Sequence, residues 1–369
     1  MSGFRLAHAA APDWTRAAKA CVAQLGSAES SLGFVYVSDH LAGDLGPLVA
    51  YLKKSTGVAH WVGTIGIGIV ATGREYFDEP AMAVMLADLP ERTFRIVPTI
   101  DGDLATFRVA ARDWLYIAQP AFGIVHGDPR NPATPELVAG LAEATASYLV
   151  GGLTSSRAGH GQVADGLSEG GISGVLFSAE VAVATGLTQG CSPIGKAHAV
   201  TAGEKNVIFE LDGESALDTL MSEAGVDGFE ELAREVRLLH AALPIAGSDT
   251  GDYLVRNLVG IDPQRGWVAI GDLVAPGNRV MFCRRDQDSA RRDMARMLDG
   301  LKRRIKGPPR AGVYYTCLAR GPNLFGEGSV ELRAIRAELG DFPLVGFFCN
   351  GEISHDRLYG YTGVLSLFL

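Results

Sequence analysis

Hydrophobic and polar positions repeat in the same order in three segments of this chain, which cover residues 33–68, 122–156 and 312–352. Each segment begins with a short run rich in β-branched and aromatic residues, continues through a polar loop, and then places apolar residues at helical spacing. A second β-rich run follows the helical stretch. Each segment therefore predicts a β-α-β unit with a loop after its first strand.

The second β-rich run of each segment carries glycine, at Gly63, at Gly151 and Gly152, and at Gly346. Glycine inside a strand allows another backbone or a ligand to approach closely. The first and third segments resemble each other most, which predicts an internal duplication and two related lobes.

The hydrophobic pattern of the rest of the chain indicates the fold class. Strand-rich stretches cover residues 173–187, 206–213 and 253–286, and "YTGVLSLFL" (361–369) predicts a buried last strand. Helical spacing predicts helices over 12–25, 44–54, 135–146, 214–224, 227–240, 286–304 and 328–339. We expect a mixed α/β (α+β) protein, a layered sandwich in which two related lobes of mixed β-sheet are flanked by helices.

Composition excludes several classes of protein. The chain has 369 residues, 47% hydrophobic residues and a formal net charge of −9, which disfavours a nucleic-acid partner. The basic clusters at 291–296 and 302–310 are interpreted as a solvated helix face. The N-terminal region does not resemble a secretory signal and no long apolar run occurs, so we expect a soluble cytoplasmic protein without a membrane partner.

The sequence allows more than one role for the cysteines and histidines. Five cysteines without CxxC spacing argue against disulfides and zinc, and no cofactor is expected. In "GCSPIG" (190–195), Cys191 is interpreted as a packed residue in a turn that Pro193 fixes. One alternative is an amidase-like or acyl-transfer enzyme with Cys191 or Cys317 as nucleophile. A weaker one is a haem-based gas sensor with His126 or His198 as axial ligand.

Two strand ends carry convergent polar groups. Arg320 and Gly321 follow one predicted strand, and Asn350, Gly351 and Glu352 follow the next. An arginine can hold a carboxylate and a glutamate can accept from an ammonium, which suits a zwitterion such as an amino acid. The alternative is an internal Arg320–Glu352 ion pair that fastens the two strands.

Five stretches in order resemble the FIST family: "VGTIGIGI", "GGLTSS", "QGCSPIGKAHAVT" with "NVIFELDGESALDTL", "CLARGPNLFG" and "PLVGFFCNGEI". The resemblance covers residues 30–369 and implies an N-terminal helix at 1–29, an N-terminal FIST domain at 30–220 and a C-terminal one at 221–369. It also implies a sensory protein for a small ligand, an amino acid or other small carboxylate held in a cleft between lobes. A separate signalling protein would then be its partner.

The resemblance also assigns ligand-binding positions. The residues that match its motifs are Cys191, Ser192, Pro193, Gly195, Arg320, Gly321, Asn350, Gly351 and Glu352. The chain departs from the family pattern at two places. Thr64–Gly66 replaces a more polar turn of the family, and Tyr359 stands where the family often has histidine.

Overall fold

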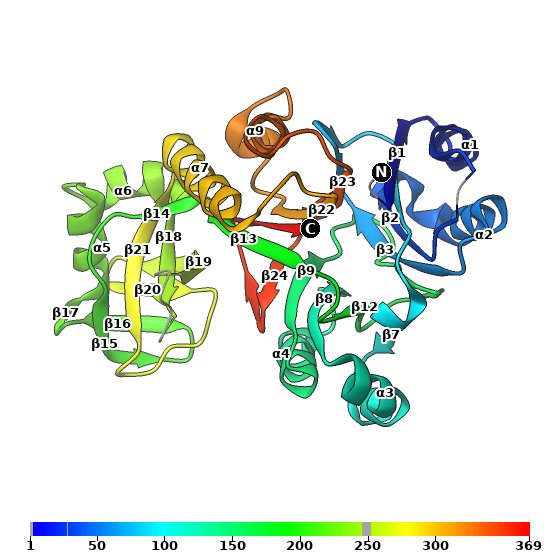
Figure 1. Ribbon diagram of the computed structural model, residues 1–369. Helices are drawn as coiled ribbons and strands as arrows, with labels where there is room; N and C mark the ends of the chain where they lie inside the picture. The colour runs from blue at the N-terminus through cyan, green and yellow to red at the C-terminus, as the bar shows by residue number, and fades with distance from the viewer. Residues whose placement is uncertain (1–2, 28, 246–251) are drawn as a thin grey trace. The chain divides into compact units, whose positions relative to one another are not determined.

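The computed structural model describes residues 3–27, 29–245 and 252–369 (Figure 1). The chain divides into two compact units. Unit 1 contains Met1–Thr188 and Met294–Leu369, and unit 2 contains Gln189–Asp293. The mixed α/β class expected from the sequence is confirmed, because each unit combines β-sheet with helices.

Unit 1 consists of three consecutive repeats of one strand–helix order. The first repeat contains β1 (Phe4–Ala10), α1 (Trp14–Leu25), β2 (Leu32–Ser38), η1 (Asp39–Asp44), α2 (Leu45–Thr56), β3 (His60–Gly66), β4 (Gly68–Ala71), β5 (Arg74–Phe77) and β6 (Ala81–Ala87). The second contains η2 (Glu91–Thr93), β7 (Phe94–Ile100), α3 (Ala105–Ala118), β8 (Pro120–Gly127), α4 (Thr134–Thr145), β9 (Tyr148–Leu153), β10 (Gln162–Ala164), β11 (Gly166–Ser168) and β12 (Ile172–Ser178).

The third repeat is interrupted by unit 2. It contains β13 (Val183–Gln189), α7 (Gln287–Arg304), β22 (Ala311–Cys317), α8 (Pro322–Phe325), α9 (Val330–Leu339), β23 (Leu344–Cys349), β24 (Glu352–His355), β25 (Arg357–Tyr359) and β26 (Thr362–Phe368). In the sequence, unit 2 extends from Gln189, the last residue of β13, to Asp293, within α7. The first and third segments of the sequence pattern therefore belong to one unit, not to two lobes.

Each repeat forms the centre of one six-stranded sheet, and the three sheets have the same topology. The strand orders are β1-β6-β2-β3-β10-β11, β7-β12-β8-β9-β24-β25 and β13-β26-β22-β23-β4-β5. The third and fourth strands of each order are the parallel pair of a β-α-β unit. The last two strands form a hairpin that each repeat donates to a neighbouring sheet. The first repeat donates to the third sheet, the third to the second, and the second to the first.

A glycine on the returning strand sets the spacing of each parallel pair. Gly63 lies opposite Val35, Gly151 opposite Val125 and Gly346 opposite Tyr314. At each position an added Cβ would overlap the carbonyl oxygen of the residue opposite. The sequence analysis predicted a close approach at these glycines, and the approaching group is the backbone of the neighbouring strand.

The inner faces of the three sheets share one hydrophobic core. Its members come from all three repeats and include Phe34, Ile124 and Val313 at equivalent positions. Two residues further along these strands, Tyr36, His126 and Tyr315 converge. The Tyr36 hydroxyl lies 2.8 Å from the Tyr315 hydroxyl and 3.1 Å from Nε2 of His126. This hydrogen-bonded group, which we call the central triad, is fully buried.

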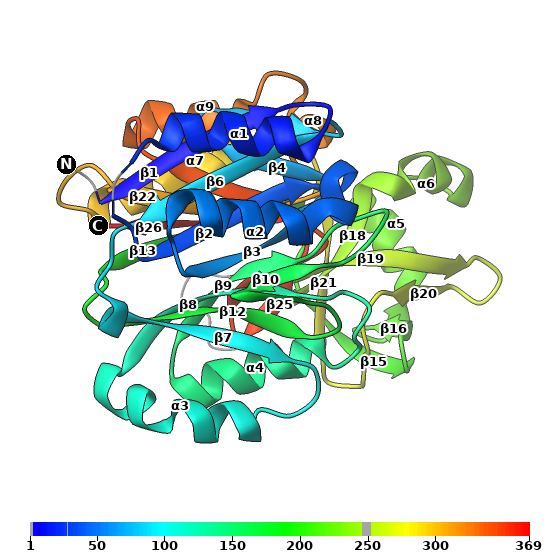
Figure 2. The same ribbon diagram turned by 90° about the vertical axis from the view of Figure 1, so that its right-hand side faces the viewer.

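Helices cover the outer face of each sheet (Figure 2). Helices α1 and α2 pack on the first sheet, α3 and α4 on the second, and α7 and α9 on the third. A separate hydrophobic cluster fills the space beneath each pair of helices. For the helices other than α3, the apolar stripe predicted from sequence is the surface that they bury. Within the described residues, no helix is long and apolar enough to cross a membrane.

Unit 2 has a different construction. Its strands are β14 (Cys191–Pro193), β15 (His198–Glu204), β16 (Val207–Leu211), β17 (Glu214–Ser215), β18 (Leu239–Pro244), β19 (Tyr253–Asp262), β20 (Trp267–Ile270) and β21 (Arg279–Arg285). Neighbouring strands of this sheet run antiparallel among the described residues. Strand β18 also pairs with β21, so the sheet closes on itself. Its helical segments are α5 (Ala216–Ala224), α6 (Phe229–Glu235) and η3 (Val236–Leu238). A core of its own fills this unit.

Several elements were absent from the sequence prediction, among them β1, β6, β7 and α3. The strand β1 precedes α1 at the start of the chain, and α3 precedes β8. The helix predicted over 227–240 ends early, because α6 stops at Glu235 and residues 239–244 form β18. The helix α3 was not predicted, although Phe107 and Ala111 lie four residues apart on its buried face.

Replacement of Gly63 by alanine is expected to destabilise unit 1 by about 3 kcal/mol or more, because the new methyl group must displace the backbone of β2. Chemical denaturation measures this loss. Gly166→Ala is the matched control, since Gly166 is also in a strand but has open space around its Cα. Equal effects of the two substitutions would contradict the steric explanation.

The His126 imidazole is expected to make the protein acid-sensitive. Burial lowers its pKa to about 3, whereas an unfolded histidine titrates near 6.5. Below pH 6.5 the unfolded chain therefore gains a proton that the folded chain excludes, and stability falls by about 1.4 kcal/mol per pH unit toward pH 3. His126→Phe should lower stability at pH 7 but flatten this slope. His355→Asn, at an exposed histidine, should leave the slope unchanged.

Candidate functional site

Polar side chains gather where the first strand of each parallel pair of unit 1 ends. Ser38, Asp128 and Cys317 each lie two residues beyond a member of the central triad, at or just after the ends of β2, β8 and β22. The carboxyl ends of parallel strands are common places for ligands in α/β proteins. The three loops that follow these strands are the candidate sites of unit 1.

The first loop is closed by an ion pair. Arg157 donates from Nε and Nη2 to the two carboxylate oxygens of Asp39, at 2.8 Å each. Its Nη2 also lies 2.6 Å from Asp78. Burial by itself would raise the pKa of Asp39, but the hydrogen bonds from Arg157 hold that pKa below its usual value. Both carboxylates therefore have their counter-charge within the protein.

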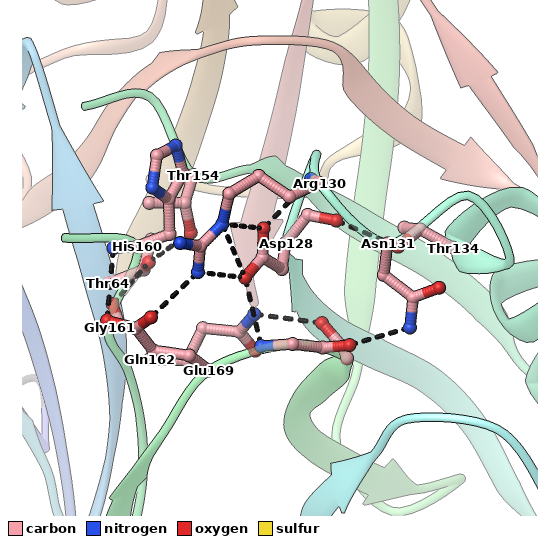
Figure 3. A network of polar contacts seen from close by, with 12 residues as sticks. Thr64, Asp128, Arg130, Asn131, Thr134, Thr154, His160, Gly161, Gln162 and Glu169 are labelled. Carbon is pink, nitrogen blue, oxygen red and sulfur yellow. Dashed lines mark hydrogen bonds and ion pairs between the residues drawn. The ribbon is translucent and has the colours of Figure 1, made fainter. Parts of the chain in front are cut away.

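The second loop is closed by a larger network (Figure 3). The buried Asp128 carboxylate accepts from Arg130 and from the N–H of Gly170, and Arg130 also pairs with Glu169 at 2.7 Å. Burial by itself would raise the pKa of Asp128, but these hydrogen bonds lower it to about 2. Close by, Gln162 accepts from Ser173 and donates to the carbonyl of Gly171. This loop is occupied by its own side chains.

The third loop contains Arg320, whose side chain is fully buried. Its Nε and Nη2 donate to Oε1 of Glu331 at 3.0 and 2.7 Å. Glu331 also accepts from the Tyr314 hydroxyl and from the N–H of Gly321. Burial by itself would lower the pKa of Arg320, but Glu331 raises it above its ordinary value, so the guanidinium stays charged. The expected alternative, an Arg320–Glu352 ion pair, is wrong: the partner of Arg320 is Glu331.

Glu352 is the second buried ionisable group of this loop. Its Oε2 accepts from the hydroxyl of Thr362 at 2.7 Å and from the N–H of Thr362 at 3.1 Å. Burial raises the pKa of Glu352 to about 8, although Thr362, the nearby Arg320 charge and the Cys317 thiol act in the opposite direction. At neutral pH the carboxyl group is therefore mostly protonated.

Within the part of the chain that the structure describes, two buried polar atoms of the third loop lack a partner, as does Nδ1 of His160 beside the second loop. Nη1 of Arg320 and Oε1 of Glu352 are both buried and have no hydrogen-bond partner among the described residues. Leaving such groups unpaired costs free energy, so buried polar groups in native proteins are nearly always satisfied. The third loop is therefore the candidate ligand site of unit 1, because both of its buried ionisable side chains keep an atom without a partner among the described residues.

The other predicted residues of this loop have structural roles. The N–H of Gly321 donates to Glu331 at 3.0 Å. The N–H of Asn350 donates to the carbonyl of Leu153, and the carbonyl of Gly351 accepts from the N–H of Leu153. The Asn350 side chain is exposed. Thus the structure brings Arg320, Gly321 and Glu352 together, while Asn350 and Gly351 fasten the start of β24 to β9.

Cys191, Ser192, Pro193 and Gly195 belong to unit 2. Residues 191–193 form the strand β14, paired with β21, where a turn was expected. Cys191 is buried, as predicted, and its carbonyl accepts from the Tyr253 hydroxyl at 2.6 Å. Gly195 lies against the Glu223 carboxylate, which leaves no room for a Cβ. Glu223 in turn accepts from Nε2 of His198 at 2.7 Å.

The thiols of Cys317 and Cys349 have surroundings that suppress reactivity. Burial, and then the neighbouring Glu352, raise the pKa of Cys317 above its ordinary value. Cys349, which lies opposite Cys317 in the parallel pair, is fully buried and its pKa is raised in the same way. Because the thiolate is the nucleophile, these environments disfavour a catalytic role for Cys317.

The two histidines considered as haem ligands do not fit that role in this structure. The ring of His126 is enclosed by Tyr36, Tyr315 and Phe347 in the central core. Both ring nitrogens of His198 are engaged, Nδ1 by Asp212 at 2.9 Å and Nε2 by Glu223 at 2.7 Å. An axial ligand needs a free ring nitrogen that faces an open space.

The sequence analysis missed Glu331 and Thr362, which hold Arg320 and Glu352 in place. Glu331 is in the first turn of α9, where an acidic residue is ordinarily a solvated helix-terminus charge. Thr362 begins β26, and its spacing of ten residues from Glu352 carries no sequence motif. Only the folded arrangement of β22, α9 and β24 shows that both residues face the same loop.

Glu352→Gln is expected to remove part of the pH dependence of stability. A carboxyl group whose pKa is about 8 in the folded chain holds a proton that the unfolded chain releases near pH 4.5, so its stabilising effect is lost as pH rises from 4.5 to 8. Wild-type stability should therefore fall between pH 6 and 8 by about 2 kcal/mol more than that of the variant. Urea denaturation at both pH values measures this, with the surface substitution Glu338→Gln as control. Parallel curves would contradict the buried, protonated carboxyl.

Comparison with known proteins agrees with this description. The FIST N domain matches residues 31–214 and the FIST C domain matches residues 218–355. An uncharacterized protein of Mycobacterium tuberculosis is 32% identical over 387 residues, covering 97% of each chain. An uncharacterized protein of Mycobacterium bovis is 30% identical over 328 residues, covering 84% of this chain and 82% of the relative. The resemblance noted in the sequence is confirmed, and the chain belongs to the FIST family.

Proposed function

We propose that this protein senses a small carboxylate-bearing metabolite, with amino acids as the leading class, and transmits its bound state to a separate signalling protein. FIST domains are consistent with a sensory role in signal transduction. The ligand class and the partner are the parts that the proposal adds. The observation that carries it is the pair of buried, unsatisfied atoms, Nη1 of Arg320 and Oε1 of Glu352.

The chemistry of these two atoms selects the ligand class. Arg320 is held rigidly by Glu331, so its remaining N–H group is a preoriented donor for one carboxylate oxygen. Glu352 is anchored through Oε2 by Thr362, which leaves Oε1 to accept from an ammonium group. A zwitterion satisfies both atoms at once, whereas a simple carboxylate satisfies one.

Because the pKa of Glu352 is raised, binding of an amino acid should have a measurable effect on the protonation of this carboxyl group. The carboxyl is mostly protonated at pH 7, and an ammonium group beside it favours the charged form. Binding of an amino acid should therefore release a proton. The loop residues Leu318 and Ala319 and the turn residue Asn350 retain exposed surface, so ligand entry requires only a movement at this end of the strands. The assignments of Cys191, Ser192, Pro193 and Gly195 remain predictions from the family resemblance.

A thermal-shift screen of the full chain against the standard amino acids and small mono- and dicarboxylates tests the proposal. A ligand of the native state raises the melting temperature with the logarithm of its concentration. We expect a dose-dependent shift from amino acids. Calorimetric titration at pH 7 in buffers of different ionisation enthalpy should then show proton release, which Glu352→Gln abolishes.

The choice of arginine variant matters for this test. Arg320→Ala leaves the Glu331 carboxylate buried without its partner and is expected to cost about 3–5 kcal/mol of stability. Arg320→Lys keeps the charge next to Glu331 but removes Nη1. It should weaken amino-acid binding at least about tenfold while circular dichroism shows a folded chain. Wild-type affinity in this folded variant would exclude Arg320 as the ligand contact, and no shift from any compound in the screen would contradict the ligand class.

A further inference from the structure

The outer face of α3 is apolar in a way that its equivalents are not. Val109, Tyr116 and Ile117 are 78%, 83% and 80% exposed. With 3.6 residues per turn, Val109 and Tyr116 lie on one line that points away from the sheet, opposite the buried Phe107 and Ala111. The exposed residues within about 60° of this line are Ala105, Thr106, Arg112 and Asp113. We call Ala105, Thr106, Val109 and Tyr116 the α3 stripe.

The threefold repeat provides an internal control for this surface. Helix α1 occupies the same place in the first repeat as α3 in the second and α7 in the third. The exposed residues of α1 are Thr15, Arg16, Lys19, Ala20, Ala23 and Gln24. Those of α7 are Gln287, Asp288, Arg291, Arg292, Ala295, Arg296, Asp299, Lys302, Arg303 and Arg304. Large apolar side chains on the solvent face are therefore not required by the fold and mark an interaction surface.

The α3 stripe has flanks of opposite character. Arg108 and Arg112, four residues apart, follow one side of the line from Val109 to Tyr116, and Asp113 and Ile117 follow the other. All four flanking residues are exposed. Among the described residues, no ion pair involves Arg108, Arg112 or Asp113, so these charges are available to a partner.

We propose that α3 is the contact surface between two copies of this chain, related by a twofold axis that runs parallel to the helix. Such an axis places Val109 and Tyr116 of one copy against the same residues of the other. It also brings the arginine flank of each copy against the aspartate flank of the other. The pair of Arg112 and Asp113 therefore forms two equivalent contacts, one on each side of the axis. The surface is thus self-complementary in both shape and charge. This inference is independent of the ligand site.

Charge decides between the two possible twofold axes. An axis perpendicular to the helix gives an antiparallel pair of helices. Each flank then faces the same flank of the second copy, so Arg108 and Arg112 face arginines. The axis parallel to the helix avoids this repulsion. A contact of one helix and its surroundings buries on the order of 1,000 Å², at the low end for stable interfaces, so we expect a dissociation constant in the micromolar range.

Sedimentation velocity of the full chain between about 1 and 500 µM tests the proposal. The expected result is a concentration-dependent shift from the 39.0 kDa monomer toward twice that mass. Val109→Glu should keep the chain monomeric throughout, whereas Ala23→Glu, at an exposed position of α1, should not change the equilibrium. A wild-type monomer at every concentration, or a dimer unaffected by Val109→Glu, would overturn the proposal.

A charge exchange tests the orientation. Arg112→Asp and Asp113→Arg should each weaken dimerisation by about tenfold, because each puts like charges together twice. An equimolar mixture of the two variants, and the double variant R112D/D113R, should both recover the wild-type equilibrium. A mixture no stronger than either variant alone would refute the axis parallel to α3. Val109→Cys should form an intermolecular disulfide on mild oxidation, and failure to do so in a dimeric sample would refute it as well.

Discussion

The close approach of two parallel strands is the constraint on which unit 1 depends. In each repeat the carbonyl group opposite Gly63, Gly151 or Gly346 occupies the space that any side chain would need. This fixes the register of the pair, and the register decides which residues of the first strand face inward. Because the same register occurs three times, Tyr36, His126 and Tyr315 meet at the centre and the three inner faces enclose one core.

The same repetition concentrates polar groups at one end of that core. Each first strand ends within two residues of the central triad, and each donated hairpin begins beside a neighbouring sheet. The three ends therefore provide equivalent positions that sequence divergence has filled differently. At two of these strand ends the charge is balanced by an ion pair, between Asp39 and Arg157 at the first and between Asp128 and Arg130 at the second. The third holds Arg320, paired with Glu331, and Glu352, and each of them keeps one buried atom without a partner among the described residues.

The features of the fold and the site that could be predicted from the sequence are those that depend on residues close together in the chain. The three β-α-β segments and most helices were predictable because hydrophobic period is a property of neighbouring residues. The helix α3 was missed although Phe107 and Ala111 repeat at helical spacing on its buried face. Arg320 and Glu352 were identified from their residue types and strand-end positions. Their partners Glu331 and Thr362 were not, because those contacts depend on how α9 and β26 pack. The insertion of unit 2 likewise separates β13 from α7 in the sequence and conceals the start of the third copy of the pattern.

The exchange of hairpins gives the unit a closed, ring-like connectivity. Each repeat lends two strands to one neighbour and receives two from the other, so no repeat possesses a complete sheet of its own. The ring closes where the Phe4 and Phe368 rings lie 5.0 Å apart between the first and last strands. Removing or loosening any one repeat would therefore expose edges in two sheets simultaneously. Such interlocking makes unfolding all-or-none across the whole unit, and it lets a disturbance at one strand end reach the other two through shared strands rather than through side chains alone.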